Sequence, residues 1–562
     1  MGERISRKVG GDAVNEYMLI FSLGPVQPFI EQARKTRDLW LGSYLFSLLM
    51  EAVMEEVKSA NIGANFVFPS VWENKGPISN LPSKYIAIFD DLDEAKQATE
   101  LSQRGLKKLW GAREAADQER PIEGHTICED VWNTIVKDFA APETRSIWDK
   151  QVDPDKVFES FWVIVERRPG EPYFDWLQRS ETVLNARKRL NTFQRQDEYG
   201  EKSTISGERQ ALYGTLERSD KSLRQQAREF WIKLATRTET KESSLSPKDL
   251  SHDGSERLDA VETVKRFAIV SEPFKERLQN VGFPSTSTIA TASFVERLLT
   301  TSVPQELYAE WNRTVKAWRN ATTNQLARMS PNTIPYLKAR AEGREWLLRR
   351  DGDCFFQETF RSRYLEKEYG ISNIKREGER ESQAEQLARS GRNALHDLIT
   401  LITDPAINIR HPTPYYATLK MDGDQMGSLF RAIDDQKKHT NLSQALSDFA
   451  SKARTIIEDS YPGRLVYAGG DDVLALAPLA RDIPEAARQQ AGPLHTVLNL
   501  VGLLQQQYRI QIQNNLRPDQ SEATARIGIV IAHHYTPLST VLRATREAEK
   551  LAKDRYNRNA LV

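Results

Sequence analysis

Hydrophobic positions alternate with polar ones in short runs, and recur at helical spacing between them, over residues 412–562. The pattern predicts, in order, a strand at 415–421, a helix over 442–457 with Ser443 as N-cap, a hairpin of two strands around 464–477, a helix at 484–508, a strand at 524–532 and a helix at 539–556. This β-α-β-β-α-β order is typical of a ferredoxin-like domain. We therefore expect the C-terminal region to fold around one antiparallel sheet.

The N-terminal region has a similar mixture of patterns. It predicts a strand at 16–23, a turn at 24–27, one long helix at 28–57, a strand at 84–90, a helix at 92–109 and a further strand at 158–165. From 196 to 411 the pattern is mainly helical, with a polar linker at 239–257. We expect an α+β fold in three domains: 1–195 and 412–562, each with a sheet, and a mainly helical domain at 196–411.

Length and composition narrow the class of protein. A chain of 562 residues exceeds what one hydrophobic core usually serves. Its 78 basic and 78 acidic residues balance, which disfavours wrapping of nucleic acid by this chain alone and leaves a local basic groove or nucleic-acid-holding partners open. There is no long apolar run and no signal-peptide pattern, and Cys128 and Cys354 suit neither a four-thiolate zinc site nor a disulfide framework. We expect a cytoplasmic protein without membrane contact.

The strongest chemical signal is the hairpin tip Gly469-Gly470-Asp471-Asp472. Glycine permits positive φ and close approach of a ligand, and adjacent acids repel each other unless a cation such as Mg²⁺ lies between them. Glycine and aspartate are also ordinary turn formers, so the hairpin alone leaves a plain turn open. The strand that ends at Asp422 is a natural neighbour of this hairpin. We therefore predict that Asp422, Asp471 and Asp472 bind Mg²⁺ or Mn²⁺.

Such a site suits phosphoryl transfer. Two divalent ions about 4 Å apart can clamp the attacking and leaving oxygens of an in-line displacement. Free backbone amides between Gly423 and Ser428, at the predicted start of a helix, are suited to phosphate oxygens. Cations suited to neutralising a triphosphate follow on or just after the last helix, although each one alone is more typical of a solvated surface: Lys550, Lys553, Arg555 and Arg558.

The histidines are weaker candidates. His396-Asp397 lies on a predicted helix without further metal ligands nearby, which indicates a structural role. His533 and His534 would point to opposite faces of a strand, and His439 is predicted to lie in a loop. The chain contains neither a P-loop motif nor a serine nucleophile elbow.

Several blocks of sequence form a specific combination. They are GPVQPFIEQARKTRDLWLGSYLFS (24–47), ARKRLNTF (186–193), GFPSTSTIA (282–290), YYATLKMDGDQMG (415–427), LSQALSDFA (442–450), YAGGDD (467–472), GIVIAHHYTPL (528–538) and AEKLAK…RN (548–559). Together they resemble the large polymerase–cyclase subunit of type III CRISPR effectors, in the Cmr (III-B) branch. The last block is also similar to the GGDEF diguanylate cyclases, which share this palm domain.

The resemblance implies two facing palm domains with a helical domain between them, two ATP molecules in the cleft, and metal on the GGDD palm only. Where that palm has Met421-Asp-Gly-Asp, the first has Ser22-Leu-Gly-Pro. It also implies a target-RNA-activated nucleotidyltransferase that makes cyclic oligoadenylate, with other Cmr-type subunits, guide RNA and target RNA as partners. The implied catalytic residues are Asp471 and Asp472, with Asp422 completing the metal site; the implied nucleotide contacts are Gly423, Gly469, Gly470, Ser428, Lys553 and Ser43.

The chain departs from this family pattern in three places. Many relatives begin with an HD nuclease domain, but here the GPVQ block starts at residue 24, so we expect no HD nuclease. Segment 202–208 has serines and threonine where relatives often carry a cysteine zinc cluster, so we expect no zinc. The sequence stops at 559–562, where relatives continue into a strand and a helical domain.

Two alternatives to the nucleotidyltransferase stay open. One is a catalytically silent scaffold subunit whose palm binds nucleotide without turnover; the intact acids at 422, 471 and 472 weigh against it. The other is a diguanylate-type cyclase, which the GGDD sequence, the single metal-bearing palm and the GPVQ block all disfavour.

Overall fold

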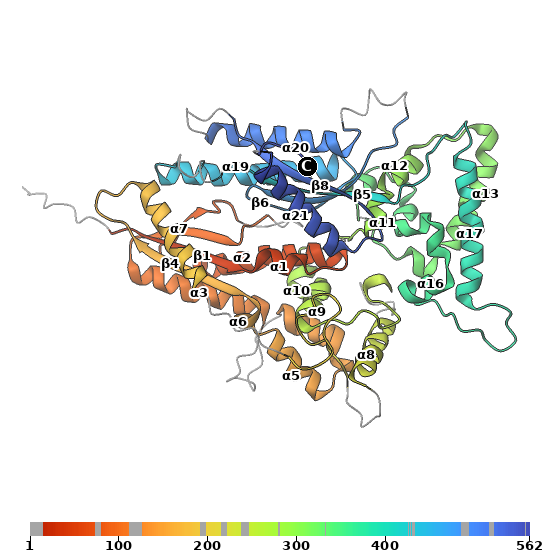
Figure 1. Cartoon of the computed structure of the whole chain (residues 1–562), viewed down its shortest axis with the longest axis horizontal. Helices are drawn as coiled ribbons and strands as arrows, with labels where there is room; N and C mark the ends of the chain where they lie inside the picture. The colour runs from red at the N-terminus through yellow and green to blue at the C-terminus, as the bar shows by residue number, and fades with distance from the viewer. Residues whose placement is uncertain are drawn as a thin grey trace, which may run out of the picture.

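The structure is a computed structural model that describes residues 15–72, 80–111, 126–190, 198–214, 222–237, 247–278, 281–331, 333–424, 426, 429, 433–484, 494–515, 522–556 and 558–562. Two four-stranded antiparallel sheets form its framework, with strand orders β2-β3-β1-β4 and β6-β7-β5-β8. Helices surround both sheets (Figure 1). The predicted α+β class, with two sheets and a mainly helical stretch between them in the chain, is confirmed. The expected domain boundaries at 195 and 411 stay predictions.

The first sheet is centred on β1 (Tyr17–Gly24), which pairs with β3 (Lys84–Phe89) and β4 (Glu159–Glu166), while β2 (Asn65–Phe68) forms an edge. Alternate residues of β1 enter different cores, as the period of two requires. Leu19 and Phe21 pack with α2 (Thr36–Ser59) and α3 (Leu92–Trp110), and Met18 and Ile20 pack with α7 (Tyr173–Arg189).

The long helix predicted at 28–57 is wrong in one respect, because the structure divides it into α1 (Val26–Glu31) and α2. The Asp38 carboxylate accepts the backbone N–H groups of Arg34 and Lys35, at 3.1 and 3.0 Å, and so caps the start of α2. Lys265 donates to the Phe29 carbonyl at 2.6 Å and to that of Gln32 across the break.

The second sheet contains β5 (Tyr415–Gly423), β6 (Arg464–Gly469), β7 (Asp472–Pro478) and β8 (Ala525–His533). One face packs against α19 (Gln436–Arg454) and α20 (Val497–Ile512), and the other packs against α21 (Leu538–Asp554). This order confirms the predicted β-α-β-β-α-β arrangement.

Two details of the second-sheet prediction are wrong. The Asp435 side chain caps α19 by accepting the N–H of Lys438 at 2.8 Å, so the helix starts before Ser443 and contains His439, which was expected in a loop. Thr496 caps α20 in the same way, so that helix begins at Val497 rather than at 484. Both caps are polar and lie outside the apolar pattern, which is why periodicity misses them.

The remaining helices lie at the sides of the two sheets (Figure 1). Those near the first sheet are α4 (Ile127–Val131), η1 (Trp132–Val136), η2 (Lys137–Phe139), α5 (Pro142–Gln151), α6 (Pro154–Val157), α8 (Leu223–Arg237), η3 (Pro247–Asp249), α9 (Ala260–Phe267), η4 (Ala268–Val270) and α10 (Glu272–Lys275). The others are α11 (Thr286–Ala290), α12 (Ala292–Thr300), η5 (Gln305–Leu307), α13 (Tyr308–Ala321), η6 (Asn324–Ala327), α14 (Pro335–Lys338), α15 (Glu345–Leu348), η7 (Gly352–Phe355), η8 (Gln357–Phe360), α16 (Ser362–Tyr369), α17 (Gln383–Ile402), η9 (Thr455–Asp459) and η11 (Gln513–Asn515).

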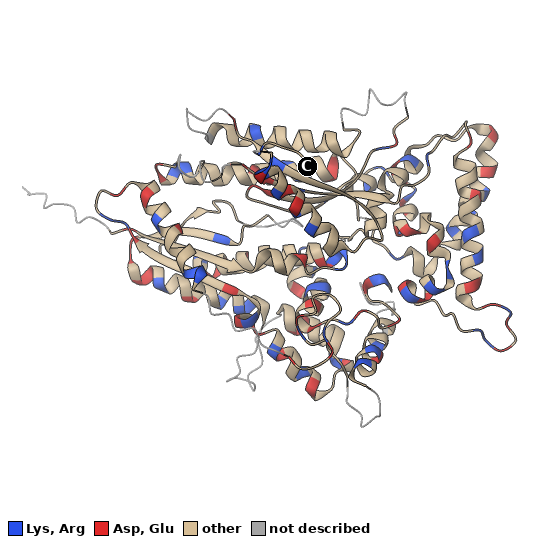
Figure 2. Cartoon of the chain, viewed as in Figure 1, with Lys and Arg blue, Asp and Glu red and all other residues tan. Residues whose placement is uncertain are grey.

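The two sheets share a hydrophobic core, which includes Met18 and Ile20 of β1 and Leu419 and Met421 of β5. Across this junction the Ser70 backbone N–H donates to the Ser443 hydroxyl at 2.8 Å. Charges of both signs are interspersed along the helices (Figure 2), in keeping with the zero net charge. None of the described helices is both long enough and apolar enough to span a bilayer.

Candidate active site

The GGDD sequence forms the predicted hairpin turn between β6 and β7. Gly469 pairs with Asp472, and Gly470 adopts a φ of 65°, a left-handed conformation that favours glycine. At the end of the neighbouring β5, Gly423 has no room for a side chain, since a Cβ there would lie 2.8 Å from the Asp471 Cβ. The Gly423 backbone donates a hydrogen bond to the Asp471 carboxylate. These glycines bring Asp471 against the end of β5.

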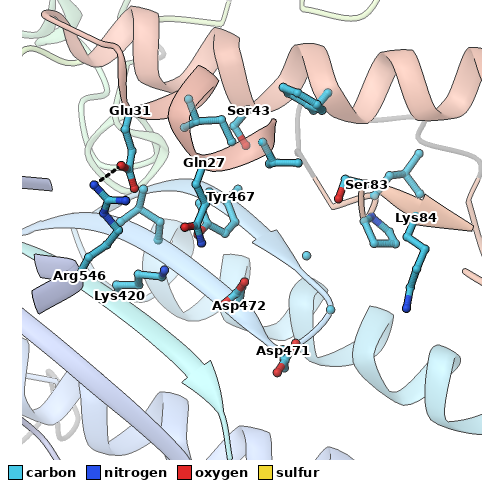
Figure 3. Close-up of a pocket in the computed structure, with 18 of the residues that line it drawn as sticks. Gln27, Glu31, Ser43, Ser83, Lys84, Lys420, Tyr467, Asp471, Asp472 and Arg546 are labelled. Atoms are coloured by element: carbon cyan, nitrogen blue, oxygen red, sulfur yellow. Dashed lines mark ion pairs between the residues drawn. The ribbon is translucent and has the colours of Figure 1, made fainter. Parts of the chain in front are cut away.

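Asp471 and Asp472 line a cavity of about 400 Å³ between the two sheets (Figure 3). One wall comes from the first half of the chain, with Gln27, Ser43 and Lys84. The opposite wall belongs to the second sheet and α21. Three of the predicted nucleotide contacts, Ser43, Gly469 and Gly470, line this cavity, and their contact with nucleotide stays a prediction.

The paired acids are electrostatically unfavourable in this position. Burial and, to a smaller extent, the neighbouring charge of Asp472 together raise the pKa of Asp471 to about 7. Burial likewise raises the pKa of Asp472 to about 6, although the Lys420 ammonium opposes the shift. The Asp472 Oδ1 atom is buried without a hydrogen-bond partner among the described residues. Two adjacent carboxylates with an unused oxygen fit a hard divalent cation.

Asp422 has a different environment from the one predicted. Its carboxylate forms an ion pair with Arg526, its register partner on β8, and Arg526 also contacts Asp424 at 3.1 Å and Glu549. Within the described ranges no cluster of three or more His, Cys, Asp or Glu side chains has a geometry that could hold a metal ion. Sequence reasoning missed Arg526 because a single arginine in a strand has no distinctive pattern. The role of Asp422 as a third ligand stays a prediction that requires release from Arg526.

Cations that the sequence analysis did not single out approach the acids from other elements. Lys420 projects from β5 into the cavity, where it makes no hydrogen bond or ion pair with any described residue. Arg546 of α21 forms an ion pair with Glu31 of α1 at 2.5 Å, and Lys84 of β3 pairs with Glu181 at 2.6 Å. Of these three cations, only Lys420 has a signal in the sequence, because a lysine inside the apolar run 415–421 is unusual and indicates a specific role.

The other predicted nucleotide contacts do not line the cavity within the described residues: Gly423 lies beside Asp471, behind the cavity lining. Lys553 is exposed near the end of α21 and does not line this cavity. Ser428 lies outside the described residues. The charged side chains that line the site are thus Asp471, Asp472, Glu31, Lys84, Lys420 and Arg546. Acids that can hold a metal ion and cations that can neutralise phosphate, in one cavity, suit binding of a metal-bound nucleoside triphosphate.

Two family models match parts of the chain. Residues 415–562 match the family model described as Cas10/Cmr2, second palm domain, and residues 18–116 match CRISPR-associated protein Cmr2, N-terminal. The curated protein CRISPR system Cmr subunit Cmr2 from Pyrococcus furiosus is 22% identical over 556 residues, an alignment that covers 84% of this chain. The chain spans about half the length of that relative, 55% of it.

Solved structures share the fold at low sequence identity. A type III-B Cmr-beta structure in the apo state matches with a TM-score of 0.53 and 14% identity, covering 96% of this chain and 67% of its own. The Cmr-beta structure bound to cognate target RNA matches with a TM-score of 0.55 and 14% identity, covering 96% and 68%.

Proposed function

We propose that this chain, which matches Cas10/Cmr2 family models over residues 415–562 and 18–116, is the large subunit of a type III CRISPR effector and a target-RNA-activated, metal-dependent nucleotidyltransferase that converts ATP into cyclic oligoadenylate or a related adenylate. The observation that carries the proposal is the pair Asp471 and Asp472 facing cations across a cavity between the two sheets. The proposed partners are other Cmr-type subunits, the guide RNA and the target RNA.

The chain's own residues have separate tasks in this reaction. Asp471 and Asp472 would hold Mg²⁺ or Mn²⁺, with Asp422 as a further candidate ligand. Such an ion, when bound, supplies charge neutralisation at the triphosphate and lowers the pKa of the attacking 3′-hydroxyl. Lys420 neutralises negative charge that builds up on the phosphates. Phe46 and Phe68 give the cavity apolar surface on the side of the first sheet, which suits a base.

The bond changes balance for each linkage formed. A 3′-hydroxyl oxygen attacks the α-phosphorus of a second ATP, the bond to the bridging oxygen of the β-phosphate breaks, and pyrophosphate leaves with the electron pair. The hydroxyl proton is lost to solvent or to a nearby base. No redox partner is needed.

The arrangement around Asp422 favours a second candidate function. Its ion pair with Arg526 leaves two of the three predicted carboxylates in the cavity, which suits a scaffold subunit that binds nucleotide without turnover. The two candidates differ in whether Asp422 leaves Arg526 when a metal ion binds.

Product analysis separates them. The chain is assembled with its partner subunits and guide RNA, incubated with target RNA, ATP and Mg²⁺ or Mn²⁺, and the products are identified by mass spectrometry. The D471A/D472A variant is tested in parallel, together with a reaction without target RNA. We expect oligoadenylates from the wild type only, and only with target RNA. ATP binding without any product from the wild type would support the scaffold instead.

A further inference from the structure

A second cleft, of about 760 Å³, adjoins the GGDD cavity. Glu31 and Arg546 line both spaces, so their side chains form part of the wall between them. Beyond this wall the cleft is lined by Arg34 and Lys35 from the α1–α2 connection and by Arg543 from α21. The two cavities therefore share a boundary made of one ion pair.

Separating the Glu31–Arg546 ion pair costs little free energy. Arg546 and Glu31 are 2.5 Å apart, with side chains that are 39% and 18% exposed, and ion pairs of such exposure add little stability. Burial raises the pKa of Glu31, although Arg546 and Lys420 act in the opposite direction, so the carboxylate is held there at a cost. Figure 3 shows the pair at one end of the GGDD cavity, beside Lys420. An anion that approached Lys420 would compete with Glu31 for Arg546.

The second cleft offers one arginine that has no ion pair among the described residues and another whose ion pair is long. Arg543 is exposed and forms no ion pair or hydrogen bond within the described ranges. Arg34 has a side chain 42% exposed and lies 3.8 Å from Glu256, a buried carboxylate already paired with Arg266 at 2.6 Å. Three acids line the cleft with them: Glu31, Glu256 and Glu368 of α16. Positive charge with flexible, solvated side chains suits phosphates along a strand.

The size of the GGDD cavity supplies the second argument. About 400 Å³ is near the lower end of the volumes that hold one drug-sized ligand. Each linkage made there adds a further nucleotide and a further phosphate to the product. A lengthening product must extend out of the cavity, and the neighbouring cleft is a space beside it that carries Arg34 and Arg543.

We propose that this cleft binds the phosphates of an oligonucleotide lengthening in the GGDD cavity, and that the Glu31–Arg546 pair closes the passage between the two spaces until the product displaces it. The inference rests on the proposed function. It assigns Arg543 and Arg34 to product binding and Glu31 to control of the passage.

The test compares R543Q and R34Q with R363Q, in the assembled full chain. Arg363 is an exposed arginine of α16 that lines neither cavity and has no ion pair or hydrogen bond among the described residues, so it controls for the loss of a surface charge. Two quantities are measured: the length distribution of the products from ATP, and the binding of 5′-triphosphorylated linear triadenylate and of ATP to a D471N/D472N background that cannot turn them over.

We expect R543Q and R34Q each to weaken triadenylate binding by about threefold to tenfold, which corresponds to loss of one solvent-accessible contact with phosphate. ATP binding should stay within about twofold, and R363Q should match the wild type. Products should become shorter in R543Q, while E31Q, which opens the passage, should make them longer. Unchanged triadenylate binding and unchanged product lengths in R543Q and R34Q would overturn the proposal.

Failure of the proposed function gives a different result. If the wild type makes no oligonucleotide, the product arm contradicts the nucleotidyltransferase, while the triadenylate arm still tests the cleft. Binding that depends on Arg543 in that case supports the cleft as an oligonucleotide site, and binding that does not depend on it overturns the inference.

Discussion

Asp471 and Asp472 stand side by side at the turn of the β6–β7 hairpin, where burial raises the pKa of both carboxyl groups. Replacing Asp472 by asparagine removes one of two repelling groups while keeping its size. Without metal, we expect D472N to be more stable than the wild type by about 1–2 kcal/mol, because the half-buried charge is lost. Addition of Mn²⁺ should raise the melting temperature of the wild type and leave that of D472N unchanged.

Differential scanning fluorimetry with and without Mn²⁺ measures both effects. D434N is a matched control, since Asp434 is an exposed aspartate that lies outside the cavity. A melting temperature of D472N that rises with Mn²⁺ as much as that of the wild type would place the cation elsewhere.

Lys420 is the cavity cation that makes no hydrogen bond or ion pair with the described residues, and it lowers the pKa of Asp472 through its charge. We expect K420Q to weaken ATP binding about tenfold or more, equivalent to about 1.4 kcal/mol, because the triphosphate loses a charged contact. Equilibrium binding of ATP with Mn²⁺ measures the change. Lys437 is an exposed lysine of α19, so the control variant K437Q should bind ATP as the wild type does. Equal ATP affinities for K420Q and K437Q would exclude Lys420 from the phosphate site.

At the scale of elements, α21 is held against β8 by the absence of a side chain at Gly528. A Cβ at this position would lie no farther than 3.0 Å from backbone atoms of Thr545, Ala548 and Glu549. Because backbone cannot rotate away, G528A should force α21 off the sheet and destabilise the protein by about 1–3 kcal/mol. Urea unfolding measures this cost, and weaker ATP binding should accompany it, since α21 carries Thr545 and Arg546 into the cavity.

Gly502 of α20 provides the opposite case. It is exposed, and a Cβ there would meet no atom within 4 Å. Alanine in a helix costs less backbone entropy than glycine, so G502A should stabilise the protein by about 0.5–1 kcal/mol. If G528A and G502A shifted the urea midpoint in the same direction, close packing at Gly528 would not be the cause.

Helices and strands with a clear apolar pattern could be predicted from the sequence, whereas their polar boundaries could not. The strand into Asp422 and the GGDD hairpin follow from local alternation and turn residues, and both are present as β5 and β6–β7. The start of α19 and the break between α1 and α2 depend on the polar caps Asp435 and Asp38, which apolar periodicity does not register. The four residues of β2 are too few to give a period at all.

The candidate site was predictable where it is local and unpredictable where it joins distant segments. Asp471, Asp472, Gly469 and Gly470 belong to a single turn, and the structure keeps them together. The partner of Asp422 is 104 positions away in sequence, as Arg526. Arg546 and Glu31 meet only because α21 crosses to α1 between the two sheets. Such pairs depend on how the elements pack, and a single sequence carries no signal for it.

For the whole molecule, the junction of the two sheets determines whether the cavity forms, because its walls come from both. His439 of α19 lies in this junction, stacked on Phe68 of β2 with 6.1 Å between ring centroids. Its Nδ1 atom is 2.9 Å from the hydroxyl of Tyr173 on α7. The buried imidazole of His439 thus links α19, which packs on the second sheet, to strand β2 of the first sheet and to helix α7, which packs on the first sheet.

The protonation of this histidine makes the junction sensitive to acid. Burial lowers the pKa of His439 to about 3, with a smaller effect from the Lys84 charge, whereas the unfolded chain titrates near 6.5. Between these two pKa values the imidazole is protonated in the unfolded state and neutral in the folded state. The stability that depends on neutral His439 is fully present above pH 6.5 and is lost as the pH falls from 6.5 towards 3, by about 1.4 kcal/mol per unit.

H439Q tests this at the scale of the whole protein, because glutamine keeps an acceptor for Tyr173 and does not titrate. At pH 7.5 we expect H439Q to be less stable than the wild type by about 1 kcal/mol, from poorer packing against Phe68. At pH 4.5 the wild type has lost about 2–3 kcal/mol through His439, so H439Q should be the more stable of the two. Urea midpoints at both pH values measure the reversal, with H396Q on the exposed face of α17 as the control. A difference between H439Q and wild type that is the same at pH 4.5 and 7.5 would mean that the buried histidine does not link the junction of the two sheets to pH.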